Sequence, residues 1–279
     1  MSGFDPGWLA LREPVDHAAR NAQIEDMVRE HFAERTSLTV VDLGCGTGSN
    51  LRALAPALPP RQHWHLVDGD LELLVEAKRR LATWADSARD TDHEIWLDKG
   101  GCQIRVSFEC ADLTVRDLHF RDITPDLVTA AALFDLVSME WLERLVAASA
   151  RRHVPLYAVL SYDGLARWRP ETALDERVVA AFNRHQQRDK GFGPALGPAA
   201  SDALSTLLLR HGYRSWQGGS PWQLGVGDRP LIGALTAGFA AAASDMEPEM
   251  ADALAAWARE QADAEDVMIG HQDIFAAVY

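Results

Sequence analysis

A glycine-rich stretch near the N-terminus has residue types and spacing suited to binding a nucleoside-like ligand. Residues 39–43 are β-branched or apolar apart from Asp42, which is typical of a buried strand, and Gly44, Gly46 and Gly48 follow before leucines at helical spacing. Glycines at such a turn adopt positive φ and leave no Cβ in the way of a ligand, while free N–H groups at the helix start attract polar or anionic groups. The sequence therefore predicts a strand, a ligand-binding glycine loop and a helix.

The spacing of the glycines separates two kinds of nucleotide site. Dinucleotide-binding dehydrogenases use G-x-G-x-x-G, in which the third glycine allows close packing of helix on strand. Here the pattern is G-x-G-x-G, Ser49 follows Gly48, and Asp42 stands two residues before the first glycine. This arrangement resembles motif I of class I S-adenosylmethionine (SAM)-dependent methyltransferases, in which the loop lies along the methionine part of SAM.

Two further acids follow predicted strands. Asp68 ends a strand 20 residues beyond Gly48, where a carboxylate can accept hydrogen bonds from both ribose hydroxyls. Asp70 is the alternative for this role, although it could instead cap the following helix. The resemblance implies that Asp112, after the third strand, accepts from the exocyclic amine of adenine beside the backbone of Leu113; the other interpretation of Asp112 is a turn cap.

The resemblance covers residues 36–162 well and the closing strands more loosely, and its motifs are specific in their order and spacing. It implies SAM as cofactor. Taken together, the motifs assign the following residues to the cofactor site: Asp42, Gly44, Cys45, Gly46, Gly48, Asn50, Asp68, Gly69, Asp112, Leu113 and Ala130.

The predicted fold is α/β, a doubly wound, seven-stranded Rossmann-like methyltransferase sheet. We divide the chain into an N-terminal helical segment, 1–35, and a methyltransferase domain, 36–279. Residues 163–200 are expected to form a cap insertion after the fifth strand, which is predicted over 154–161. The polar stretch 86–92 is expected to be a loop.

Candidate catalytic residues lie near the carboxyl ends of the fourth and fifth strands, the side on which ligands bind in open parallel sheets. His185 in the cap is the first candidate for a general base because its ordinary pKa is near neutrality, and Tyr162 and Asp163 are the second. Asp135 has two interpretations, a substrate-facing acid or a cap for the next helix.

Composition limits the partners. With 27 Lys and Arg against 41 Asp and Glu in 279 residues, the formal net charge of −14 opposes nucleic acid and anionic membranes. No secretory signal or membrane span is evident, and the three cysteines form no disulfide framework, so we expect a cytoplasmic protein. The oligomeric state is not defined, and a homodimer is one open alternative.

The predicted function is transfer of a methyl group from SAM to a small-molecule acceptor by SN2 displacement, as in the bacterial group that the chain resembles. Two alternatives stay open: an RNA or protein methyltransferase, and a SAM-binding protein without methyl transfer. No metal site is predicted, because His63 and His65 share a strand face without a third ligand at suitable spacing.

Overall fold

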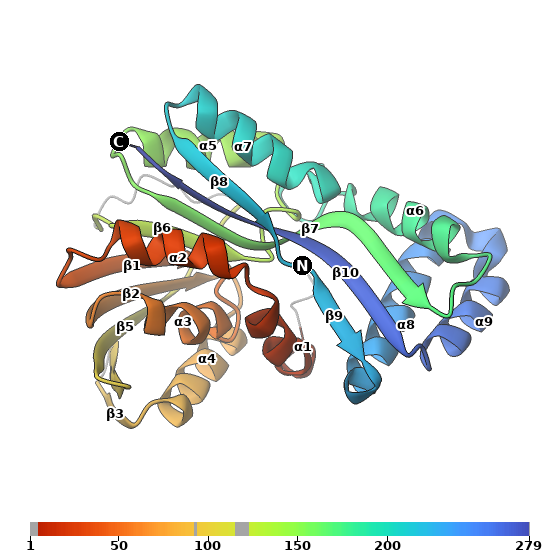
Figure 1. Ribbon diagram of the computed structural model, residues 1–279, viewed down its shortest axis with the longest axis horizontal. Helices are drawn as coiled ribbons and strands as arrows, with labels where there is room; N and C mark the ends of the chain where they lie inside the picture. Colours follow the sequence, from red (N-terminus) through yellow and green to blue (C-terminus); the bar gives the residue numbers. More distant parts are fainter. Residues whose placement is uncertain (1–4, 92–93, 115–122, 279) are drawn as a thin grey trace.

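The computed structural model describes residues 5–91, 94–114 and 123–278 (Figure 1). The start of the predicted N-terminal segment and the last residue of the predicted seventh strand lie outside these residues. Within them, ten strands form one sheet: β1 (Ser37–Leu43), β2 (Arg61–Asp68), β3 (Ser87–Asp90), β4 (Glu94–Lys99), β5 (Cys102–Cys110), β6 (Leu127–Ala131), β7 (Leu156–Arg169), β8 (Arg214–Gly219), β9 (Trp222–Gly225) and β10 (Asp266–Ala277).

Helices precede β1, connect β1 to β2, β2 to β3 and β6 to β7, and then lie between β7 and β8 and between β9 and β10. The α-helices are α1 (Pro6–Ala19), α2 (Ala22–His31), α3 (Ser49–Leu54), α4 (Leu71–Trp84), α5 (Met139–Ala150), α6 (Asp175–Gln186), α7 (Ala200–Arg210), α8 (Arg229–Met246) and α9 (Ala251–Gln261). Short 3-10 turns are η1 (Ala55–Ala57), η2 (Gly197–Ala199), η3 (Val226–Asp228) and η4 (Pro248–Met250). No helix among the described residues is long and apolar enough to cross a membrane.

The sheet order is β3-β4-β5-β2-β1-β6-β7-β10-β8, with β9 beside β10. The five central strands from β5 to β7 are parallel, and β10 runs antiparallel between β7 and β8. The mixed α/β fold with a parallel centre is therefore confirmed. The predicted strands correspond to β1, β2, β5, β6, β7, β8 and β10, but the count of seven is not confirmed, because β3, β4 and β9 bring the sheet to ten strands.

The unpredicted strand β3 lies within the stretch expected to be a loop. All four of its residues are exposed, and it pairs antiparallel with β4 at the sheet edge. A strand exposed on both faces carries no alternation of apolar and polar residues, so the sequence pattern could not reveal it.

Helices cover both faces of the sheet, as doubly wound folds require. Successive residues of a strand point to opposite faces, and β1 shows this directly. Val41 lies in a core with Trp141 of α5, while Val40 lies in the core on the other face with Leu51 of α3. The two cores hold β1 between them and so fix the glycine loop that follows it.

The predicted N-terminal helical segment contains two helices, α1 and α2. The break comes at Asn21, whose side chain accepts from the Ile24 N–H and caps α2. A proline usually ends or kinks a helix, yet Pro14 lies inside α1. The first helix is thereby free to cross the glycine loop while the second packs on the sheet.

The strands β7 and β10 are long and continue past the central sheet into a second lobe formed with β9, α6, α8 and α9 (Figure 1). The rings of Trp168, Phe239 and Trp257 lie at its core, with centroids 5.1 Å from Trp168 to each of the other two. The lobe has a core of its own and is joined to the main sheet by the paired strands.

The predicted cap, residues 163–200, is divided: the end of β7 and α6 belong to this lobe, whereas Phe192 and Leu196 pack on the core of the main sheet with Trp141. The fifth strand does not end at 161 but continues to Arg169, because β10 supplies antiparallel partners along its length. Phe182 of α6 stacks on Phe239 of α8, with centroids 3.7 Å apart. A Cβ on Gly164 would lie 2.9 Å from Pro198, so the two ends of the segment touch.

Candidate active site

The glycine loop joins β1 to α3 in the predicted way. Gly44, Gly46 and Gly48 have φ of 63°, 52° and 76°, a region that a side chain disfavours. A Cβ on Gly44 would lie 3.2 Å from Leu133, and one on Gly46 would lie 3.4 Å from Leu9. The loop is therefore bordered by the turn after β6 on one side and by α1 on the other.

Asp68 at the end of β2 is tied to the same loop. Its Oδ2 accepts from the Gly46 N–H at 2.8 Å, and its Oδ1 accepts from the Asp70 N–H at 3.0 Å. Burial raises the pKa of Asp68, and these backbone donors partly offset the rise. Asp70 instead caps α4 by accepting from Glu72 and Leu73, which is the second interpretation given above.

A buried polar network lies beneath the loop. Asp42 is fully buried; its Oδ1 accepts from Asn50 Nδ2 at 2.8 Å, and its Oδ2 has no protein partner. Burial raises the pKa of Asp42 to about 7 in spite of the Asn50 hydrogen bond. The Asn50 amide also donates to Thr129 and accepts from Arg20, so it is wholly engaged by the protein and supports Asp42.

The remaining predicted cofactor residues surround this loop. Asp112 is exposed and accepts from the Thr114 N–H at 2.9 Å, the turn geometry that the sequence left open. The Leu113 carbonyl accepts from Trp141 Nε1. Cys45 is buried with its N–H on Val67 O, Gly69 is exposed after β2, and Ala130 is buried in β6.

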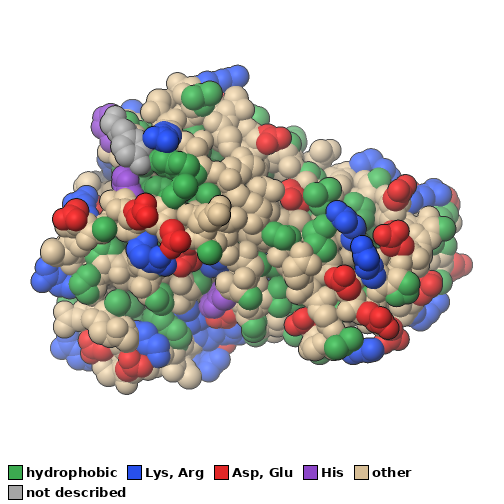
Figure 2. Space-filling model, in the orientation of Figure 1, with side chains coloured by type: hydrophobic (Ala, Val, Ile, Leu, Met, Phe, Trp, Pro, Cys, Tyr) green, Lys and Arg blue, Asp and Glu red, His purple; other side chains and the backbone are tan. Residues whose placement is uncertain are grey.

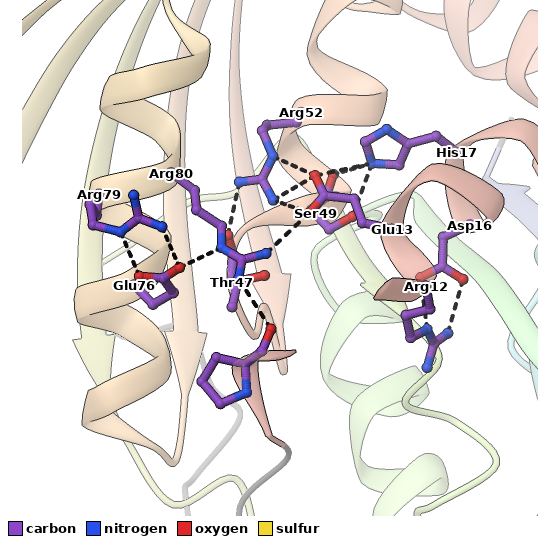
Figure 3. A network of polar contacts seen from close by, with 11 residues as sticks. Arg12, Glu13, Asp16, His17, Thr47, Ser49, Arg52, Glu76, Arg79 and Arg80 are labelled. Carbon is purple, nitrogen blue, oxygen red and sulfur yellow. Dashed lines mark hydrogen bonds and ion pairs between the residues drawn. The ribbon is translucent and has the colours of Figure 1, made fainter. Parts of the chain in front are cut away.

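Helix α1 is fastened over the loop by charged groups (Figure 3). Glu13 accepts two hydrogen bonds of 2.7 Å from Arg52, whose Nη1 donates to Thr47 O at 2.8 Å. Burial alone would raise the pKa of Glu13, but Arg52 outweighs it and the pKa lies below its ordinary value. His17 Nε2 lies 2.9 Å from Ser49 Oγ at the start of α3.

A second polar cluster, the acceptor-side cluster, lies beyond the loop, after the carboxyl end of β6 and beside the middle of β7. Its members come from six parts of the chain: Arg12, Asp135, Tyr162, Lys190, Trp222 and His271. Arg12 forms a two-bond ion pair with Asp16 and lies over the Trp222 ring, 5.0 Å from its centroid. Figure 3 shows the Arg12–Asp16 pair apart from the Glu13–Arg52 pair.

Asp135 is the acid of this cluster, and it does not cap α5. Ser138 does so by accepting from the Trp141 N–H, while Asp135 Oδ1 is buried without a protein partner. Burial raises the pKa of Asp135 to about 6, against the opposing charges of Arg12 and Lys190. Of the two interpretations of Asp135, the structure excludes the helix cap.

His271 of β10 is the other buried polar group of the cluster with an unpartnered atom, its Nδ1. Its ring lies 5.0 Å from the Trp222 ring and 6.3 Å from the Tyr162 ring, centroid to centroid. Burial, and then the charge of Arg12, lowers the pKa of His271 to about 3, so its imidazole is neutral at physiological pH.

Comparison with known proteins bears directly on this geometry. Residues 40–155 match a family described as "Methyltransferase domain". These residues, which make up less than half of the chain, are therefore similar to a methyltransferase domain. The match supports SAM as the cofactor and methyl transfer as the activity.

Solved structures with a similar fold cover most of the chain. The YcgJ protein from Bacillus subtilis shares 12% identity at a TM-score of 0.52, covering 92% of this chain and 99% of its own. A cyclopropane-fatty-acyl-phospholipid synthase-like protein from Lactobacillus casei shares 15% identity at 0.53, covering 98% and 94%. These identities show a common fold alone. A search of the curated proteins found no match.

The methyltransferase loop has unpartnered groups that suit SAM. Asp42 Oδ2 and Thr47 Oγ1 are both buried without a protein partner. The methionine end of SAM carries an ammonium and a carboxylate group, which a carboxylate and a hydroxyl can bind. The glycines have no side chains, so a ligand can approach the backbone of the loop closely. The residues present therefore fit the cofactor. Within the described chain, no group of three or more His, Cys, Asp or Glu side chains could hold a metal ion.

The predicted catalytic residues lie around the acceptor-side cluster. Tyr162 is one of its members and donates to Asn183 Oδ1 at 2.8 Å. Asp163 accepts from the Leu165 N–H and from Gln272. His185 Nδ1 lies 3.3 Å from Lys190 Nζ, and its Nε2 lies 3.6 Å from Asp245. Both ring nitrogens thus have charged neighbours, and His185 as the base stays a prediction.

Sequence reasoning missed Glu13 and His271. Glu13 lies one helical turn from Leu9, and only the crossing of α1 over the loop brings it to Arg52. His271 belongs to a strand whose pairing is set by residues a hundred positions earlier. No local pattern marks either residue.

Proposed function

We propose that this methyltransferase transfers the methyl group of SAM to a small-molecule acceptor. The observation that supports this proposal most directly is that the side chains of the acceptor-side cluster are enclosed by the protein. Asp135, Tyr162, Trp222 and His271 are 8%, 6%, 2% and 6% exposed. A small molecule can be surrounded by these groups, whereas the surface of a folded macromolecule cannot reach them without a large opening of the chain.

The cofactor is proposed to lie along the glycine loop. Asp68 is the proposed partner of the ribose hydroxyls, and Asp42 of the ammonium group. When bound there, SAM would supply an electrophilic methyl group to the acceptor's lone pair, with S-adenosylhomocysteine as the leaving group. The protein's part is to align the acceptor and exclude water.

Leu133 gives the physical link between the two parts of the site. It packs beside Gly44, and Asp135 follows two residues later in the same turn. On the other side, Leu9 of α1 lies beside Gly46. Arg12, one helical turn after Leu9, belongs to the acceptor-side cluster. Both elements that border the loop therefore also contribute to this cluster, which supports placing the acceptor there.

The surface charge favours a small molecule over nucleic acid. The net charge is −14, and on the face drawn in Figure 2 the Lys and Arg side chains lie among Asp and Glu side chains. Binding to a phosphate backbone relies on grouped cations. Retention on heparin with a steep dependence on salt would count against a small-molecule acceptor.

The test combines calorimetry with label transfer. SAM should bind the wild type, and tritium from methyl-labelled SAM, incubated with a bacterial extract, should enter the fraction below about 3 kDa, since a metabolite is far smaller than a domain. Absence of SAM binding contradicts the methyltransferase site. Label found only in RNA or protein contradicts the acceptor class.

A further inference from the structure

The oxygen Asp135 Oδ1 is a buried polar atom that the fold itself does not need. Ser138 caps α5, the backbone carbonyl of Asp135 accepts from the Gly197 N–H at 2.9 Å, and the Asp135 carboxyl group has a hydrogen bond to its own backbone, which leaves Oδ1 as the oxygen without a protein partner. Buried polar atoms are nearly always paired, because an unpaired one costs about 1–3 kcal/mol of desolvation. A ligand with a hydrogen-bond donor would supply the partner that Asp135 Oδ1 lacks.

The charged and titratable groups that face this carboxyl come from each neighbouring element. Arg12 lies on α1, Lys190 follows α6, and Tyr162 lies on β7. Arg12 is already paired with Asp16, and burial together with Arg188 lowers the pKa of Lys190. The site therefore already supplies two cationic side chains to its carboxylate, and a cationic ligand would be a third.

We propose that Asp135 accepts the proton of the acceptor nucleophile, and that this nucleophile is an uncharged hydroxyl or N–H group. The inference rests on the proposed function and names its substrate class. The acceptor's O–H or N–H bond breaks as its lone pair attacks the methyl carbon, and the released proton passes to Asp135 Oδ1. His271 Nδ1 binds a second polar group of the same molecule.

The charges of the site argue against the other acceptor classes. An ammonium compound would add a cation beside Arg12 and Lys190, and a carboxylate acceptor would face Asp135 with like charge. A thiol ionises near pH 8.5 and has little need of a carboxylate base. An uncharged hydroxyl or N–H both fills the unpartnered oxygen and requires a base.

The first measurement needs no substrate. Infrared spectra of the protein with S-adenosylhomocysteine should show a buried carboxyl that titrates near pH 6 in the wild type and in Glu140→Gln, an exposed control on α5. Asp135→Asn, which keeps the shape of the side chain, should lack this signal. If the wild type and Asp135→Asn titrate alike, Asp135 is not available as a base.

The second measurement uses tritiated SAM with catechol, ethylamine, benzoate and 2-mercaptoethanol as acceptors. Label should pass to catechol at a rate that rises with pH around pH 6, since the base must be ionised. Asp135→Asn should lower that rate roughly a hundredfold, the scale of general-base catalysis, and Glu140→Gln should not.

Three outcomes overturn the inference while SAM still binds: label only on the other three compounds, label on none of the four, or an unchanged rate in Asp135→Asn. The proposed function survives the first and third of these. Loss of SAM binding in the wild type, by contrast, removes the proposed function itself, so the two failures are distinguishable.

Discussion

At the scale of single residues, two fully or nearly fully buried carboxylates differ in how they are satisfied. Asp42 keeps one oxygen without a protein partner, whereas Asp273 accepts from Asn21 N, Leu160 N and Ser220 Oγ. Burial raises both pKa values. The difference in partners decides what an amide would do at each place.

Asp42→Asn should stabilise the cofactor-free protein by about 2 kcal/mol above pH 7, because a pKa raised from 3.8 to about 7 makes ionisation costly in the folded state. The cost is absent below about pH 4, where the carboxyl is protonated both folded and unfolded, so the gain should vanish there. Denaturant melts across this range measure it.

Asp273→Asn is the matched control and should destabilise at every pH, because the new NH2 group would face N–H donors. Equal effects of the two substitutions would contradict the assigned partners. The Asp42 variant should also bind SAM more weakly, since it loses the charge proposed to hold the ammonium group.

Asp68→Ala should weaken SAM binding by ~1.5–3 kcal/mol, the scale of hydrogen bonds to a charged group. Asp70→Ala removes only the cap of α4 and should cost about 1 kcal/mol of stability while SAM affinity is kept. Calorimetry and thermal melts on both variants separate the roles. A larger loss of affinity in Asp70→Ala would reverse the assignment.

At the scale of elements, α1 closes the site. It reaches the glycine loop through Leu9, α3 through Glu13 and His17, and α4 through Arg80, which donates to Pro6 O. Arg52 is 6% exposed at its side chain, so its charge depends on Glu13 for compensation. The helix is therefore held by a few charged groups at its middle.

Glu13→Gln should speed dissociation of S-adenosylhomocysteine roughly tenfold, the equivalent of about 1.4 kcal/mol, because one charge-assisted pair is lost from the closed state. Stopped-flow displacement measures the rate. Glu140→Gln breaks an exposed pair with Arg144 and should leave it unchanged. Equal rates for wild type and Glu13→Gln would show that α1 does not retain the product.

At the scale of the whole molecule, the sequence predicts the central sheet but not the second lobe. Apolar runs and strand-end acids mark the parallel strands, since both features are local. The extension of β7 to Arg169 depends on pairing with β10, about a hundred residues away, and β3 is exposed throughout. Asp135 could be interpreted in two ways because caps and catalytic acids use the same residue type.

The second lobe restricts where the proposed cap can move. Helix α6 is fixed by Phe182 and by ion pairs from Arg177 and Arg184 to Glu247. We therefore expect trypsin to cut the free protein after Arg188, which is exposed in the loop that follows, and more slowly once SAM and an acceptor are bound. Cleavage inside α6, or no effect of ligands, would contradict this placement.

The central claim is that SAM and acceptor meet between the glycine loop and Asp135. A crystal structure with S-adenosylhomocysteine tests it most directly. The account predicts ribose hydroxyls on Asp68, the amino group near Asp42, and the sulfur facing the acceptor-side cluster of Asp135 and His271. A sulfur that faces away from Asp135, or a ligand bound elsewhere on the chain, would contradict it.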